Sequence, residues 1–237
     1  MKFLFIKNNI FIRLLICRME IRKILIVAAH DSEAEALRRV ADACSCSPEI
    51  LVTGVGGISM AWALQKRLAA GPVPDLAINA GIAGSYVTTL RIGDVVLTGS
   101  DCFADLGIDD NGTFRSLFSA GLAGPDTFPF SGGRIYCRNR WFDKLINLFP
   151  VVNAATVNMA SGSEEPIQRI RSVWNPDIET MEGAYFAYVC SMAGLPWLGL
   201  KAVSNMTEPR NIKKWDINAA LKGLGEGFAE VIKNLEE

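Results

Sequence analysis

Residues 19–43, MEIRKILIVAAHDSEAEALRRVADA, predict a buried β-strand followed directly by an α-helix. Ile24–Ala28 is a continuous apolar run, as expected of a strand that is covered on both faces. A helical pattern follows from Glu33 to the end of this stretch. Ser32 and Glu35 have the spacing of a capping box, which gives Glu35 a structural role. Glu33 would then be the first helical residue and would point from the strand end.

The same alternation of strands and helices continues along the chain, and glycines follow several of the expected strands. The expected strands span 50–53, 76–79, 93–98, 151–156, 177–181 and 197–204, and the expected helices span 58–69, 141–148, 164–173, 183–192 and 216–235. Residues 101–130 are polar and rich in Gly and Pro, so we expect them to be mostly loop. Alternating strands and helices without an internal repeat indicate one α/β domain, with a central mixed, mostly parallel sheet flanked by helices.

Composition excludes several classes of protein. The 237 residues include 24 Lys and Arg against 25 Asp and Glu, and this balance argues against a nucleic-acid-binding protein. His30 is the single histidine, and the six cysteines have no zinc-ligand spacing, so we expect neither a metal nor a cofactor. Scattered cysteines predict small buried side chains in a reducing compartment such as the cytoplasm.

The first 18 residues, MKFLFIKNNIFIRLLICR, differ in composition from the rest. Their apolar runs are interrupted by Lys7, Asn8, Asn9 and Arg13 and are too short for a membrane span or a signal peptide. We therefore expect residues 1–18 to be an extension outside the fold, no membrane partner, and a catalytic domain at 19–237. A surface-lying amphipathic helix is the alternative for residues 1–18.

The glycine-rich stretch Gly54-Val55-Gly56-Gly57 resembles a dinucleotide-binding fingerprint only in part, because Ser59 stands where the third glycine would be. A tight turn is the better explanation of these glycines. Their backbone N–H groups could also lie near an anionic or hydroxyl-rich ligand.

Polar side chains at three other strand ends are candidates for chemistry. Glu33 follows the first strand, although a solvated glutamate in a first helical turn is also common. Glu182 lies between two apolar elements, where a carboxylate is costly unless it is hydrogen-bonded, and a diol would satisfy both of its oxygens. Ser204 and Asn205 end the last buried strand, and an asparagine amide offers the donor and acceptor that suit the edge of a heterocycle.

Several blocks together resemble the nucleoside phosphorylase/nucleosidase superfamily over residues 22–235. They are Met181-Glu182-Gly183-Ala184, Gly81-Ile82-Ala83-Gly84, Ile92–Val96 and Ala202–Asn205. Three further blocks, Phe103–Gly107, Thr156–Asn158 and Ser204-Asn205 with Trp215, are most similar to the futalosine hydrolases. That family removes hypoxanthine from futalosine in a menaquinone pathway.

The resemblance implies a role for each matching residue. Glu33 would activate water, and Asn205 would be the catalytic contact to the leaving base. The implied substrate contacts are Met181 and Glu182 to the ribose, Gly81, Ile82 and Ala83 at the floor, Met159 over the base, Thr156 and Asn158 at the wall, and Ser204 beside Asn205. Phe103 is a candidate to bind the 5′ substituent together with Phe128, Phe130 and Arg134, and the alternative is that these loop residues only fold onto the core. Related dimers also imply a homo-oligomer in which a partner's loop approaches this end of the site.

Two departures from the superfamily narrow the activity. Phosphorylases bind phosphate with a Gly-Asp-Pro…Arg loop, whereas this chain has Ala28-Ala29-His30-Asp31 without an arginine, so water is the expected nucleophile. Nucleosidases for 6-aminopurines carry an Asp where this chain has Asn205, and an Asn that only donates suits a 6-oxopurine. The alternatives are a methylthioadenosine/S-adenosylhomocysteine nucleosidase, a purine nucleoside phosphorylase, or a nucleoside-binding domain without catalysis.

Overall fold

The structure, a computed structural model, describes residues 21, 23–44 and 48–236. The strands are β1 (Ile24–Ala28), β2 (Glu49–Val52), β3 (Leu76–Ser85), β4 (Val95–Asp101), β5 (Gly107–Asp110), β6 (Thr113–Ser116), β7 (Ile135–Tyr136), β8 (Val151–Thr156), β9 (Ile178–Thr180) and β10 (Trp197–Met206). The helices are α2 (Asp31–Ala43), α3 (Gly57–Ala70), α4 (Arg140–Leu145), α5 (Glu164–Trp174), α6 (Gly183–Met192) and α7 (Ile217–Glu236), with a 3₁₀ turn at Ile212–Lys214. The predicted extension, 1–18, lies outside the described residues.

The central sheet is mixed and mostly parallel, as predicted. Strand β3 pairs in parallel with β1 on one side and with β10 on the other, and β2 continues the sheet beyond β1. On the β10 side of β3, the strands close into a ring. Strand β10 pairs with β4, β4 with β8, β8 with β9, and β9 again with β3. The ring brings the ends of strands that are distant in sequence to one place.

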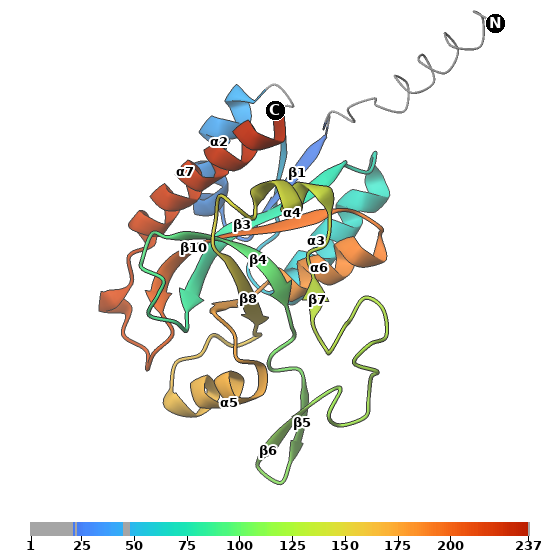
Figure 1. Cartoon of the computed structure of the whole chain (residues 1–237), viewed down its shortest axis with the longest axis vertical. Coiled ribbons are helices and arrows are strands. Elements are labelled where there is room, and N and C mark those ends of the chain that lie inside the picture. The colour runs from blue at the N-terminus through green and yellow to red at the C-terminus, as the bar shows by residue number, and fades with distance from the viewer. Residues whose placement is uncertain (1–20, 22, 45–47, 237) are drawn as a thin grey trace, which may run out of the picture.

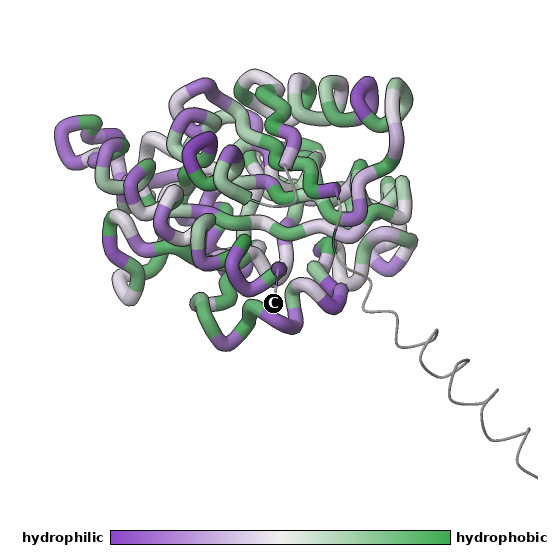
Figure 2. Tube along the Cα trace, turned by 90° about the horizontal axis from the view of Figure 1, so that it is seen from above, coloured by the Kyte–Doolittle hydropathy of each residue, from purple (hydrophilic) through white to green (hydrophobic). Residues whose placement is uncertain are grey.

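Two pairs of helices pack against this sheet (Figure 1). Helix α2 packs on α7, and α3 packs on α6. The core between sheet and helices is apolar and includes Leu37, Leu64, Phe186 and Phe228, which are fully buried. The strands that cross the middle of the molecule are mostly hydrophobic, whereas many outer loops are hydrophilic (Figure 2). No described helix is both long enough and apolar enough to span a membrane.

Most elements lie where the sequence predicted them, and three have the predicted bounds: Ile24–Ala28, Val151–Thr156 and Gly183–Met192. The largest difference is β3, which was expected to end at Asn79 but continues to Ser85. It continues because β10 pairs with it as far as Ser85 and β9 pairs with its last two residues. The expected loop at 101–130 also contains the β5–β6 hairpin.

The predicted cap of α2 was wrong. The helix begins at Asp31, and its N-cap is His30, whose Nδ1 accepts from Ser32 N at 3.1 Å. The reciprocal bond of the capping box comes from Glu33, whose carboxylate accepts from His30 N. Glu35 is instead exposed and forms an ion pair with Arg38 at 3.2 Å. The capping box thus starts two residues earlier than predicted, and Glu33 belongs to it.

The cysteines follow the sequence expectation in part. Cys102, Cys137 and Cys190 are buried free thiols, and burial raises the pKa of Cys102 to about 12. Cys44 differs from the expected pattern because it is disulfide-bonded. Cys17 and Cys46 lie outside the described residues.

Candidate active site

A cavity of about 460 Å³ opens where the chain leaves β1, β3, β9 and β10. This is the position expected for a ligand site in an α/β sheet. The predicted site residues that line it are Glu33, Ile82, Ala83, Met181, Glu182, Ser204 and Asn205. Glu33 and Asn205, which are 172 positions apart in sequence, therefore meet in one cavity.

Glu33 lies in the first turn of α2, just after β1, and three backbone N–H groups hold its carboxylate. Its Oε2 accepts hydrogen bonds from Ala29 N at 2.9 Å and His30 N at 3.1 Å, and its Oε1 accepts one from Ile82 N at 2.9 Å. The carboxylate is 7% exposed and lies on the cavity wall. A carboxylate has about four acceptor sites, so three backbone donors leave one site for a ligand or a water.

Gly81 does not line the cavity, but it makes room for this carboxylate. A Cβ at Gly81 would lie 2.6 Å from Glu33 Oε1 and 3.3 Å from Lys201 Nζ. Lys201 stands beside Gly81 in the β3–β10 register and is 3% exposed. A positive charge is therefore buried directly behind Glu33.

Glu182 is the second carboxylate of the cavity and is 8% exposed. Its Oε1 accepts a hydrogen bond of 2.8 Å from Gly56 N. Burial raises the pKa of Glu182, whereas the positive charge of Lys201 and the bond from Gly56 lower it in part, and the charge of Glu33 raises it further. The backbone N–H in the glycine-rich loop thus binds a carboxylate of the protein itself.

Asn205 is the penultimate residue of β10 and lines the cavity. Its Oδ1 accepts from the Ser204 hydroxyl at 2.8 Å, and its Nδ2 donates to Met206 O at 3.0 Å. These bonds orient the amide and leave one of its N–H groups for a ligand. Two buried hydroxyls of the cavity, Ser161 Oγ and Thr207 Oγ1, have no hydrogen-bond partner within the described chain. Buried polar atoms of this kind are normally paired.

Comparison with known proteins shows the family of this chain. The family model of the phosphorylase superfamily matches residues 46–234. The chain belongs to this superfamily.

Several members of the superfamily are similar to this chain over most of its length. A futalosine hydrolase of Thermus thermophilus is 29% identical over 77% of this chain and 80% of that protein. One of Acidothermus cellulolyticus is 30% identical over 87% of this chain and 89% of that protein. A 5'-methylthioadenosine/S-adenosylhomocysteine nucleosidase of Aeromonas salmonicida is 25% identical over 78% of this chain and 79% of that protein.

Solved structures share the fold of this superfamily member. Futalosine hydrolase of Helicobacter pylori superposes with a TM-score of 0.70 at 18% identity, covering 91% of this chain and 97% of that chain. At this identity, the similarity establishes the fold only.

Besides Gly81, four of the predicted site residues of this superfamily member do not line the cavity. Thr156 is buried behind it, where its hydroxyl donates to Asp101. Phe103 packs edge-to-face on Tyr185 with the ring centroids 4.8 Å apart. Asn158 donates to Asp105 from its backbone and its side chain, and Met159 is 72% exposed. Their roles in binding remain predictions.

The candidates for the 5′ substituent also lie elsewhere in this structure. Phe128 and Phe130 line a separate cleft of about 430 Å³ beside β7 and the end of α6. Arg134 donates to Ser100 Oγ at 2.7 Å and to Ala154 O at 2.6 Å, and so holds β4 and β8 together.

Sequence reasoning missed several polar residues at or behind the cavity. Lys201 could have been found as the one charge within the apolar strand sequence LGLKAV. Glu179 could not, because its role depends on its neighbours: it accepts from the Tyr86 hydroxyl and, at 2.8 Å, from Ser161 N. Within the described residues, no group of three or more His, Cys, Asp or Glu side chains is placed to hold a metal ion.

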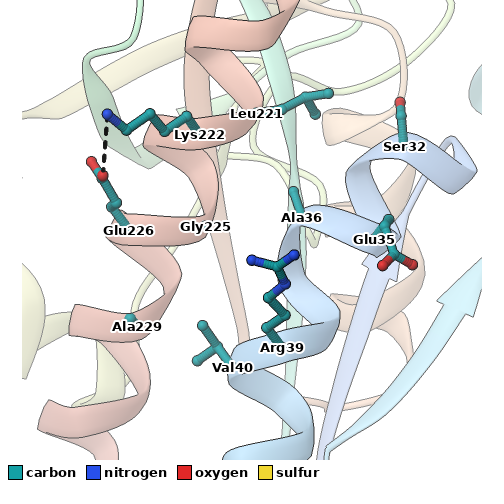
Figure 3. Close-up of a pocket in the computed structure, with 10 residues that line it drawn as sticks. All are labelled: Ser32, Glu35, Ala36, Arg39, Val40, Leu221, Lys222, Gly225, Glu226 and Ala229. Atoms are coloured by element: carbon teal, nitrogen blue, oxygen red, sulfur yellow. Dashed lines mark ion pairs between the residues drawn. The ribbon is translucent and has the colours of Figure 1, made fainter.

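A groove of about 680 Å³ runs between α2 and α7, outside this cavity (Figure 3). It is lined by the small residues Ala36, Gly225 and Ala229 and by charged side chains that include Glu35. Lys222 and Glu226 form an ion pair of 3.9 Å on its α7 side. Glu33 and Glu35 therefore face different surroundings although they lie within one helical turn.

Proposed function

We propose that this protein hydrolyses the N-glycosidic bond of futalosine and releases hypoxanthine in the futalosine route of menaquinone biosynthesis. The futalosine hydrolases that are similar over most of the chain support this substrate. The observation that carries the proposal is that two buried carboxylates, Glu33 in the first turn of α2 and Glu182 at the N-cap of α6, line one cavity.

The two carboxylates have different tasks. Hydrolysis of a nucleoside develops positive charge on the ribose, and it requires an activated water and a stabilised leaving base. Glu33 is immobilised by three N–H groups and has one acceptor site left, so it takes a proton from water. Glu182 uses Oε1 for Gly56 and offers Oε2 to the hydroxyls of the ribose.

The loop after β1 favours water over phosphate as the nucleophile. It contains no arginine, and the N–H groups of Ala29 and His30 already donate to Glu33. An incoming phosphate would need positive charge and free donors at this position. Both are missing from this loop, which supports a hydrolase rather than a phosphorylase.

Asn205 supports a 6-oxopurine as the leaving base. Its remaining N–H can donate to N7 and O6, which lie next to each other and share negative charge as the base leaves. A methylthioadenosine/S-adenosylhomocysteine nucleosidase is the second candidate, because one such protein is also similar.

We also propose that the enzyme acts in the cytoplasm as a homo-oligomer, with residues 19–237 as the catalytic domain and 1–18 as an extension. Exposed apolar side chains beside the cavity support the oligomer: Val55 lines the cavity, and Ile58 and Trp62 of α3 are 82% and 69% exposed. Light scattering tests this, and a monomer at micromolar concentration would contradict it.

The activity is tested by base release from futalosine, inosine and methylthioadenosine, with and without phosphate. We expect hypoxanthine from futalosine at a rate that phosphate does not change, and loss of the activity in Glu33→Gln. A ribose 1-phosphate product would identify a phosphorylase. Faster release of adenine from methylthioadenosine would identify the second candidate, and no release from any substrate would indicate a binding domain.

A further inference from the structure

The start of helix α6 is capped in an unusual way. An N-cap residue normally accepts a hydrogen bond from the second or third N–H of its own helix. The N-cap of α6 is Glu182, and its carboxylate makes no such bond among the described residues. It accepts from Gly56 N instead, on a loop 126 residues away in sequence. The first N–H groups of α6 therefore need other acceptors.

Two threonines from neighbouring strands supply these acceptors. Gly183 N donates to Thr180 Oγ1 at 3.3 Å, and Ala184 N donates to Thr156 Oγ1 at 2.8 Å. The Thr156 hydroxyl in turn donates to Asp101 Oδ1 at 3.0 Å and lies 2.9 Å from the Thr180 hydroxyl. A hydroxyl has one proton, so Thr180 must donate to Thr156. The carboxylate of Asp101 thus sets the direction of the whole chain of bonds.

Asp101 lies directly below the first residue of the helix. It is 1% exposed, and a Cβ at Gly183 would lie 2.1 Å from its Oδ2. Glycine is therefore required here for the carboxylate to approach so closely. The N-terminus of a helix carries a partial positive charge, which stabilises an anion at this position.

We propose that Asp101, Thr156 and Thr180 are positioning residues that keep the Glu182 carboxylate in the cavity. This inference rests on the hydrolysis proposed above. Without a hydroxyl to accept it, the Ala184 N–H, the second of its helix, would be free to bond to the side chain at the N-cap, which is Glu182. Because the hydroxyl chain satisfies this N–H group, the side chain at the N-cap is released from capping and is free to bind substrate.

The first test removes one hydroxyl at constant shape. We expect Thr156→Val to lower kcat/KM on futalosine by about 10- to 100-fold, because a small displacement of a binding group has effects of this size. Thr156→Ser keeps the hydroxyl and is expected to retain activity near that of the wild type. Thr98→Val is the matched control, since Thr98 is a buried threonine of β4 that takes no part in the hydrogen bonds between Asp101, the two threonines and α6. Equal losses in Thr156→Val and Thr98→Val would overturn the proposal.

A double-mutant cycle shows whether Thr156 acts through Glu182. In a Glu182→Gln background, we expect Thr156→Val to change kcat/KM by less than about threefold, because coupled residues are not additive. Equal fold losses in both backgrounds would overturn the proposal, since a general packing defect does not depend on residue 182. If Thr156→Val fails to fold, Thr180→Val removes only the longer bond to the helix and allows the same cycle.

Amide exchange tests the cap without any substrate. In the wild type we expect slow exchange at Gly183 and Ala184, and in Thr156→Val we expect at least tenfold faster exchange at Ala184. Unchanged exchange would overturn the proposal whatever the activity. Faster exchange in a protein that releases no base would instead overturn the proposed hydrolysis and leave the cap in place.

Discussion

Replacing Glu33 with Gln tests both the chemistry and the architecture of the site. The carboxylate accepts three backbone N–H groups, two at Oε2 and one at Oε1. An amide has one oxygen, so it can serve Ala29 and His30 only by turning its NH₂ toward Ile82 N. Two donors then face each other, and the part-buried Ile82 N–H loses its partner.

The size of both effects follows from this geometry. A buried donor without a partner costs about 1–3 kcal/mol of unfolding free energy, which lowers the Tm of a chain of this length by about 2–10 °C. Loss of a general base lowers kcat by about 10²- to 10⁴-fold. Substrate affinity should change little, because water activation acts mainly in the transition state.

The assay combines thermal unfolding with steady-state base release from futalosine, and Glu35→Gln is the control. Glu35 is exposed, and its pair with Arg38 is a surface ion pair, which contributes little. We expect the control to behave as the wild type does in both measurements. Full activity in Glu33→Gln would refute the assignment of the base, and an unchanged Tm would refute the three-bond geometry.

Three further perturbations address the other polar groups. Glu182→Gln should raise KM and lower kcat together, because bonds of its carboxylate to the ribose exist before the reaction; a change in kcat alone would contradict this role. Asn205→Asp should slow hypoxanthine release relative to adenine release in a competition assay, and equal rates would place Asn205 away from the base. Burial raises the pKa of Asp101 from 3.8 to about 6, against the lowering effects of the bond from Thr156 and the charge of Arg134. The folded state therefore holds this proton more tightly than the unfolded state does. Protonated Asp101 contributes to the free energy of unfolding at low pH, and this contribution is lost as pH rises from about 4 to about 6. Chemical denaturation at several pH values measures this. The unfolding free energy of the wild type should fall by about 3 kcal/mol relative to that of Asp101→Asn across this range, and an equal pH dependence in the two proteins would contradict the raised pKa.

Local sequence patterns predicted the elements well because hydrophobic periodicity reports which faces are buried. The run Ile24–Ala28 is apolar throughout because helices and strands cover it on all sides, and its bounds are confirmed. Strand β3 was predicted too short, since the glycines at 81 and 84 look like a turn in sequence. They lie in a strand because β10 and β9 supply partners on both sides. Such pairing depends on residues about 100 positions away, which no local window contains.

The capping box shows the same limit at the level of one side chain. Ser32 and Glu35 match the spacing of the motif, yet the structure uses His30 and Glu33. The choice depends on Ile82, whose N–H lies within reach of Glu33 but not of the exposed Glu35. A carboxylate that can gain a third buried donor is stabilised there, and this gain is visible only after β1 and β3 have paired.

The sequence by itself determined the α/β class, the mixed sheet and the candidate residues Glu33, Glu182 and Asn205, because these follow from periodicity, composition and the resemblance of short blocks. Only the tertiary structure decided how each polar group is held. Gly56 N donates to Glu182, Lys201 lies behind Glu33, and Asp101 lies below the start of α6. The physical reason is that a buried charge or donor must find its partner in space. Spacing along the chain specifies which residues are near in one helix or strand, but closure of the ring of strands specifies which loops meet.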